Sequence, residues 1–255
     1  MRFTQSICII LIICIQIIAS EYGTILASAN LEYVFPEMIK KFYKKYPDAS
    51  IHVQYGASGS LAKDIENGNN YDLFLSANMG YPQAVYKNGA AIKEAKVYAK
   101  GKLILFLPKG ILKDRVENRG LKILEESYIK HIVIANKEET PYGKATIDAL
   151  KNSNMYSKLK NKIVYTSDTG LVIDSVLWRN NVGFLPKSAL HMLPKGHITK
   201  GEDWIEIDKK LYNPIIQGYV VSKSGIKNKN AMLFLNFLTS KSGKQIFRKY
   251  GYDTP

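Results

Sequence analysis

The sequence has almost no cysteine: Cys8 and Cys14 are its only two in 255 residues. Both lie in an apolar N-terminal stretch. A chain that loses this stretch therefore has no disulfide, no thiolate metal site and no cysteine nucleophile. Cys14 follows Ile13, whereas a lipoprotein cleavage site needs a small residue in front of the cysteine. The sequence thus argues against lipidation at Cys14.

The sequence also lacks an apolar run as long as the roughly 20 residues of a membrane-spanning helix. Its most apolar run, residues 7–19, is short and is preceded by the positive charge of Arg2. Two small residues, Ala19 and Ser20, end the run. This order is typical of a secretory signal peptide with cleavage after Ser20, and an uncleaved anchor is the alternative. We therefore expect residues 1–20 to direct export.

Acidic residues are scarce: 22 Asp and Glu stand against 36 Lys and Arg, giving a formal net charge of +14. Removing residues 1–20 takes away Arg2 and leaves 35 − 22 = +13. An exported protein does not usually meet nucleic acid, so nucleic acid is a poor explanation of this positive charge. The remaining explanations are an anionic membrane surface, an acidic partner or a generally basic proteome. The hydrophobic content of 46% and charged content of 23% are ordinary for a packed protein and exclude disorder.

No internal repeat or low-complexity tract occurs. Short β-rich runs instead alternate with helical patterns, which predicts an α/β fold. The runs are almost continuously apolar, as in parallel strands buried on both faces. Strands are expected at residues 24–28, 51–55, 72–76, 103–107, 131–135, 163–166, 182–185 and 216–221.

Apolar residues three or four positions apart predict helices between these strands. The first covers residues 31–46, where Pro36 either kinks the helix or marks a true start near Phe35. A second, at residues 61–65, ends at Gly68. Further helices are expected at residues 145–150, 171–178, 231–238 and 245–250, the last ending at Gly251.

Two short segments, residues 99–101 and 213–214, have the character of crossings between lobes. A chain that leaves one α/β lobe, builds a second and returns forms a hinge with a ligand cleft beside it. We therefore expect a signal peptide at residues 1–20, a first lobe from residues 21–100 and 215–255, and a second lobe from residues 101–214.

Four turns from a strand into a helix are rich in small or hydroxylated residues: residues 27–30, 56–60, 140–143 and 167–170. The first N–H groups of a helix lack intrahelical acceptors. An anion placed at the start of a helix accepts hydrogen bonds from these groups, and no Lys or Arg is needed. In the third turn we expect Thr140 as N-cap and Pro141 as first helical residue, which leaves the N–H groups of Tyr142 and Gly143 free. The alternative is that these residues are ordinary helix caps, since spacing alone does not show that the turns converge.

The residues in and around these turns form sequence motifs that are more specific than the turns themselves. The segments are Ala27-Ser28-Ala29-Asn30-Leu31, Gly56-Ala57-Ser58-Gly59-Ser60-Leu61-Ala62, Asp72-Leu73-Phe74-Leu75-Ser76-Ala77, Pro141-Tyr142-Gly143 and Val182-Gly183-Phe184, with the ending at residues 245–252. Together they resemble the periplasmic molybdate-binding proteins of bacterial molybdate ABC transporters. The resemblance covers residues 24–252.

The resemblance implies a two-lobed type II periplasmic-binding fold, in which each lobe is a mostly parallel sheet flanked by helices. It implies capture of molybdate, and of tungstate, by Asn30 and Ser58 of the first lobe and by the N–H groups of Tyr142 and Thr169 of the second. It also implies delivery to a membrane permease, no enzymatic activity and no cofactor. We expect a periplasmic monomer with no nucleic-acid partner.

Two positions depart from the family pattern. Asn30 stands where a serine is common, and its amide still donates. Pro186 stands where some members place a donor tyrosine, and proline has no group to donate. The Tyr142 hydroxyl or a water is a candidate replacement. We expect cavity size to select against sulfate and phosphate, and the absence of acceptors to select further against protonated phosphate.

Other functions remain open at this point. The ligand of a binding protein could instead be tungstate alone, sulfate, phosphate or ferric ion, although no two of the 17 tyrosines are adjacent. A secreted serine hydrolase using Ser58 is a further alternative, but Ser60 occupies the final glycine position of the Gly-x-Ser-x-Gly pattern. The histidines show no metal-ligand spacing; they are His52, His131, His191 and His197.

Overall fold

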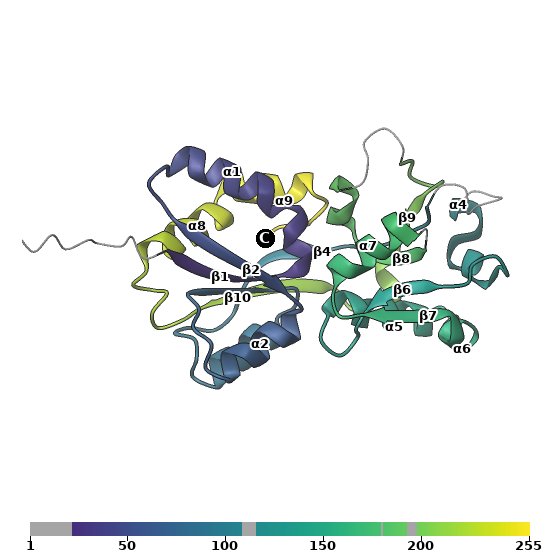
Figure 1. The fold of residues 1–255 in the computed structure, drawn as a ribbon, viewed down its shortest axis with the longest axis horizontal. Helices are drawn as coiled ribbons and strands as arrows, with labels where there is room; N and C mark the ends of the chain where they lie inside the picture. The colour runs from purple at the N-terminus through teal and green to yellow at the C-terminus, as the bar shows by residue number, and fades with distance from the viewer. Residues whose placement is uncertain (1–21, 109–115, 180, 193–197) are drawn as a thin grey trace, which may run out of the picture.

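A computed structural model describes residues 22–108, 116–179, 181–192 and 198–255 of the protein. Its strands form two five-stranded sheets that lie side by side along the longest axis of the molecule (Figure 1). The signal peptide predicted at residues 1–20 lies outside the described residues. Within them, no helix is long and apolar enough to cross a membrane.

The first sheet has the strand order β2-β1-β3-β10-β4. Strand β1 is parallel to β2 and β3, whereas β10 is antiparallel to β3 and β4, so the sheet is mixed. The strands are β1 (Gly23–Ser28), β2 (Ile51–Gly56), β3 (Leu73–Ser76), β4 (Lys96–Gly101) and β10 (Ile215–Val221).

Alternate residues of β1 pack on opposite faces of this sheet, as the two-residue repeat of a strand requires. Ile25 and Ala27 join the core formed with helices α1 (Phe35–Lys45), α8 (Lys229–Thr239) and α9 (Lys241–Lys249). Leu26 packs on the other face, against α2 (Ser58–Glu66) and α3 (Gly80–Lys87). We call the sheet with these five helices the first lobe.

The second sheet repeats this plan with the order β7-β6-β8-β5-β9. Its strands are β5 (Leu103–Phe106), β6 (Ile132–Ala135), β7 (Ile163–Thr166), β8 (Val182–Pro186) and β9 (Trp204–Glu206). Strand β6 is parallel to β7 and β8, and β5 is antiparallel to β8 and β9. One face packs against α5 (Pro141–Asn152) and α6 (Tyr156–Leu159), and the other against α7 (Thr169–Arg179). The sheet, these helices and α4 (Val116–Arg119) form the second lobe.

Short 3-10 helices connect several of these elements. They are η1 (Ala29–Tyr33), η2 (Gly120–Glu125), η3 (Lys160–Lys162), η4 (Lys187–His191) and η5 (Lys209–Leu211). Pro36 lies in the first turn of α1, directly after η1, so it marks the start of a new helix instead of kinking a longer one. This outcome fits proline, which has no N–H to lose in the first turn.

The chain passes between the lobes twice, and the two passages are neighbours. Strand β4 ends at Gly101 and β5 begins at Leu103, while β10 opens at Ile215, whose partner in the antiparallel ladder is Gly101. The crossing expected at residues 99–101 is therefore misplaced, because these residues form the end of edge strand β4 and the crossing itself falls on Lys102. The predicted lobe boundaries, residues 21–100 with 215–255 and residues 101–214, stay a prediction.

Candidate functional site

The four predicted turns lie at the carboxyl ends of parallel strands. Ser28 and Gly56, which end β1 and β2, are partners in the first sheet, and the chain runs from them into η1 and α2. Ala135 and Thr166 are partners in the same way in the second sheet, and α5 and α7 follow them. In open α/β sheets, ligands bind at this edge.

The turns of one lobe contact those of the other. Backbone N–H of Gly59 donates to the carbonyl of Glu139 at 2.9 Å, which joins the second turn to the segment in front of the third. The Tyr33 hydroxyl donates to the carbonyl of Thr169 at 3.0 Å, which joins the end of η1, after the first turn, to the fourth turn. These contacts join the two lobes at the edge where the predicted site residues lie.

Ser58 is fully buried at the start of α2. Its Oγ donates to the Ser28 hydroxyl at 3.0 Å and accepts from the backbone N–H of Ala77, also at 3.0 Å. A serine hydroxyl rotates freely and has one proton and two lone pairs. The Ser58 proton can therefore turn toward a ligand while the bond from Ala77 holds the oxygen in place.

The start of α5 presents one free N–H where two were expected. Thr140 is the N-cap, as predicted, but its Oγ1 accepts from the Gly143 N–H at 3.2 Å, so Gly143 is not free. At the start of α7, one oxygen of the Asp168 carboxylate accepts from Gly170 at 2.8 Å and from Leu171 at 3.1 Å. The N–H groups of Tyr142 and Thr169 are left without an acceptor among the described residues.

Two buried side-chain atoms also lack a partner. They are Asn30 Oδ1 and Thr169 Oγ1, and no other buried side-chain nitrogen or oxygen in the described ranges is unpaired. Buried polar groups are almost always hydrogen-bonded, because leaving one unpaired costs about 1–3 kcal/mol. Both atoms belong to residues that the sequence singled out, and they come from opposite lobes. The interface between the lobes is therefore incomplete at these two residues.

A buried polar network behind Asn30 was not anticipated from the sequence. Gln217 is its centre: Oε1 accepts from Asn30 Nδ2 at 3.2 Å and from Tyr98 at 2.7 Å, and Nε2 donates to the Tyr142 hydroxyl at 3.0 Å. The Tyr252 hydroxyl accepts from Asn30 Nδ2 at 2.9 Å. The one available signal was that Gln217 is a lone polar residue in the otherwise apolar strand β10.

The phenols of this network stay protonated at physiological pH. Burial raises the pKa of Tyr252 to about 12 and that of both Tyr98 and Tyr142 well above the usual tyrosine value. Each hydroxyl is thus a neutral group that donates and accepts. The hydrogen-bond partners of Asn30, Ser58, Tyr142 and Thr169 within the described chain are all neutral.

The Tyr142 hydroxyl lies at the hinge. It accepts from Gln217, and a Cβ added to Gly101 would come within 2.1 Å of it. Pro186, the last residue of β8, is buried and pairs with Leu103. The idea that the Tyr142 hydroxyl replaces a donor lost at Pro186 stays a prediction.

No metal centre occurs in the described ranges, where no three His, Cys, Asp or Glu side chains come together. His197 lies outside those ranges. The donors gathered between the lobes are hydroxyl, amide and backbone N–H groups. Such a set suits an anion better than a cation.

Comparison with known proteins places the chain in a family. Residues 24–253 match the family described as bacterial extracellular solute-binding protein. The molybdate-binding protein ModA of Rhodobacter capsulatus is 27% identical over 235 residues, 91% of this chain and 89% of that protein. ModA of Azotobacter vinelandii is 26% identical over 227 residues, 88% of this chain and 87% of that protein.

The fold agrees with these matches. The structure of the periplasmic molybdate-binding protein of Azotobacter vinelandii gives a TM-score of 0.81 at 24% identity and covers 91% of this chain and 99% of that chain. Proteins of the matched family bind a solute without converting it, which sets aside the hydrolase alternative at Ser58. The chain is non-enzymatic and belongs to the bacterial extracellular solute-binding proteins.

Proposed function

We propose that this protein captures molybdate between its two lobes, binds tungstate in the same way, and delivers the anion to the permease of an ABC transporter. One observation carries the proposal. The free N–H groups of Tyr142 and Thr169 stand at the starts of two helices of the second lobe, and the Asn30 and Ser58 turns of the first lobe close against that edge. The names of the relatives from two organisms support molybdate as the ligand.

The four groups have distinct roles in this proposal. The N–H groups of Tyr142 and Thr169 bind two oxygen atoms of the anion from the second lobe, where the helix dipoles also favour negative charge. The Ser58 hydroxyl and the Asn30 amide bind from the first lobe. Hydrogen bonds to a charged group contribute about 1.5–3 kcal/mol each, net of the bonds to water that they replace, so four of them contribute about 6–12 kcal/mol to binding.

A neutral set of donors also suits a transport protein, which must release what it binds. A buried Lys or Arg would be costly to desolvate and would hold the dianion through a strong charge pair. Donors alone favour an anion that carries no proton. Sulfate is smaller and cannot reach all the donors at good hydrogen-bond distance, so it should bind more weakly, whereas molybdate and tungstate share a size and a tetrahedral shape.

The setting of the protein follows from the same proposal. Residues 1–20 act as a signal peptide, and the mature monomer works in the periplasm with residues 21–100 and 215–255 as one lobe and residues 101–214 as the other. The anion enters while the lobes are open. The closed surface then docks on the permease.

Isothermal titration calorimetry on protein freed of bound anions tests the proposal. We expect tight binding of molybdate and tungstate and at least about 100-fold weaker binding of sulfate and phosphate, a difference of about 2.7 kcal/mol. A preference for sulfate or phosphate would reject molybdate as the ligand. Native mass spectrometry of protein from medium with trace molybdate and tungstate supplies an independent check, because the mass of a retained anion identifies it.

A further inference from the structure

Asn30 and Gln217 are hydrogen-bonded to each other in the buried interior of the first lobe, and each side chain ends in an amide with one acceptor oxygen and one nitrogen that carries two protons. Asn30 Nδ2 donates to Gln217 Oε1 at 3.2 Å and to the Tyr252 hydroxyl at 2.9 Å. Both protons of that nitrogen are then used. What remains for a ligand is Oδ1, the buried oxygen that has no partner.

This orientation of Asn30 is wrong for a bare oxyanion, because an acceptor repels another acceptor. Asn30 cannot turn over by itself. Turning the amide over would put Asn30 Oδ1 where Nδ2 now lies, 3.2 Å from Gln217 Oε1. Two acceptor oxygens would then meet in a buried site with no proton between them. A donor reaches the ligand only if Gln217 turns over as well.

The surrounding hydroxyls accommodate that second orientation. With Gln217 turned, its Nε2 donates to Asn30 Oδ1 and to the Tyr98 oxygen, which lies 2.7 Å from the present Oε1 position. The Tyr98 proton goes to the carbonyl of Ser76, 3.1 Å away. Gln217 Oε1 then takes the present place of Nε2, 3.0 Å from the Tyr142 hydroxyl, and accepts a hydrogen bond from it. Every member keeps a partner, and Asn30 Nδ2 is free to donate to the ligand.

We propose that Gln217 is a positioning residue that sets which end of the Asn30 amide faces the ligand, and that the two amides turn over together. A tetrahedral oxyanion without a proton selects the orientation with Asn30 Nδ2 toward it. An oxyanion that bears a hydroxyl group selects the orientation with Oδ1 toward it. This inference rests on the proposed function, since it assigns the specificity of that same site.

The test is a double-mutant cycle read by calorimetry with molybdate. When its carboxyl is ionised, Gln217→Glu supplies only acceptors, so it holds Asn30 Nδ2 toward itself and turns Oδ1 to the ligand; the cycle is therefore run at pH 8 and above. Asn30→Ser removes the amide but keeps a donor. We expect Gln217→Glu to lower molybdate affinity at least about tenfold more with asparagine at position 30 than with serine there. Added negative charge acts in both backgrounds and cancels in this comparison.

A second readout separates positioning from simple damage. At pH 8 hydrogen phosphate is a dianion like molybdate but carries a hydroxyl group. In the Gln217→Glu protein we expect the molybdate-to-phosphate affinity ratio to fall about tenfold, because Asn30 Oδ1 now accepts from that hydroxyl. A merely destabilised fold would weaken both anions alike.

Gln217→Met is the matched control without charge, and circular dichroism establishes that each variant is folded. If Gln217→Glu does not fold, the same cycle is run with Gln217→Met, which frees the Asn30 amide to turn over, so the molybdate-to-phosphate ratio should change with asparagine at position 30 and stay unchanged with serine there. Equal losses in both backgrounds with an unchanged anion ratio overturn the inference. If the wild-type protein binds neither molybdate nor tungstate, the proposed function fails first, which distinguishes the two failures.

Discussion

The Ser60 hydroxyl of the first lobe donates a hydrogen bond to the Glu139 carboxylate of the second lobe at 2.8 Å. Beside it, the Gly59 N–H reaches the Glu139 carbonyl, and the Tyr81 hydroxyl reaches the carbonyl of Glu138 at 2.8 Å. None of these groups is among the four proposed ligand contacts. Lobe closure is therefore stabilised by interactions of its own.

Removing the Ser60 hydroxyl should speed ligand release. A hydrogen bond of this kind contributes about 1 kcal/mol, so Ser60→Ala should raise the dissociation rate about fivefold. Stopped-flow displacement of bound molybdate measures this rate. Ser242→Ala, at an exposed serine of α9, is the control and should leave it unchanged. Identical dissociation from both variants would mean that the Ser60 contact does not hold the closed state.

The role proposed for Thr169 belongs to its backbone N–H, and two substitutions separate this group from the side chain. Thr169→Pro removes the N–H at the first position of α7, where proline fits a helix. We expect affinity to fall about 10- to 100-fold, the equivalent of one charge-assisted bond.

Thr169→Val keeps the N–H and replaces an Oγ1 that has no partner in the described chain. Its affinity should stay within about threefold of wild type and its melting temperature should not fall. Calorimetry and thermal melting check both variants. Equal losses from proline and valine would assign the contact to the side chain instead.

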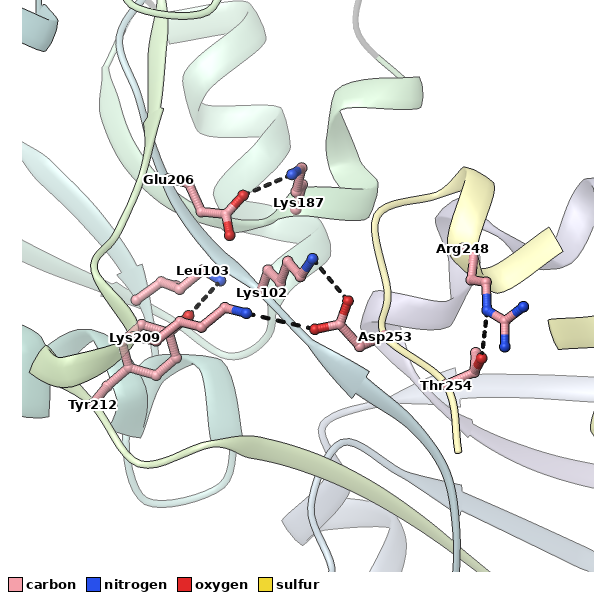
Figure 2. Close-up of polar contacts among 9 residues, drawn as sticks. All are labelled: Lys102, Leu103, Lys187, Glu206, Lys209, Tyr212, Arg248, Asp253 and Thr254. Carbon is pink, nitrogen blue, oxygen red and sulfur yellow. Dashed lines mark hydrogen bonds and ion pairs between the residues drawn. The ribbon is translucent and has the colours of Figure 1, made fainter. Parts of the chain in front are cut away.

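Asp253 ties the C-terminal segment to the hinge. Its carboxylate lies 2.9 Å from Lys102 Nζ and 3.7 Å from Lys209 Nζ (Figure 2). The hydrogen bond from Lys102 holds the pKa of Asp253 below its ordinary value. A carboxyl whose pKa is lower in the folded state stabilises the fold above its unfolded value of about 3.9, and this stabilisation is lost as the pH falls through the folded value.

Asp253→Asn should therefore melt at a lower temperature than wild type at pH 7, and the two should converge below about pH 4. Melting curves between pH 2.5 and 7 measure the difference. Asp148→Asn, which breaks an exposed pair with Lys144 on α5, should have the smaller effect. A gap between wild type and Asp253→Asn that stays constant down to pH 2.5 would exclude this role for the Asp253 carboxylate.

The positive charge of the protein should affect the approach of the anion more than its retention. We expect the association rate of molybdate to fall as NaCl rises from about 10 to 500 mM, because salt screens charges beyond a Debye length of about 10 Å at 0.1 M. The dissociation rate should change little, since the proposed contacts are neutral. Stopped-flow measurements at several salt concentrations separate the two rates, and a salt dependence confined to dissociation would contradict this account.

The strands that were predictable share one property, a continuous apolar run. All eight expected strands are present, and Ile163–Thr166 has the predicted bounds. Strand β4 was missed because Lys96 and Lys100 flank its apolar residues and leave a run of only three, at residues 97–99; an edge strand tolerates such lysines. Strand β9 has only three residues, too few for a periodic signal.

The positions of the four turns could be predicted from the sequence, because N-cap residues and glycines mark the start of a helix through local preferences alone. Which N–H groups are free was not, since the Gly143 N–H depends on the rotamer of Thr140. The network around Gln217 was also hidden. Tyr98 and Tyr252 are far apart in the sequence, and only the pairing of strands and the packing of the C-terminal segment bring them to the same amide.

Ile215 and Gly101 are partners at the end of one antiparallel ladder, so the two passages between the lobes leave the first sheet side by side. Gly101 provides the clearance at the end of this ladder, where a Cβ would stand 2.1 Å from the Tyr142 hydroxyl. A methyl group at position 101 would hold the lobes apart, and the Gly101→Ala protein should keep the larger radius of gyration of the open form even when molybdate saturates the solution.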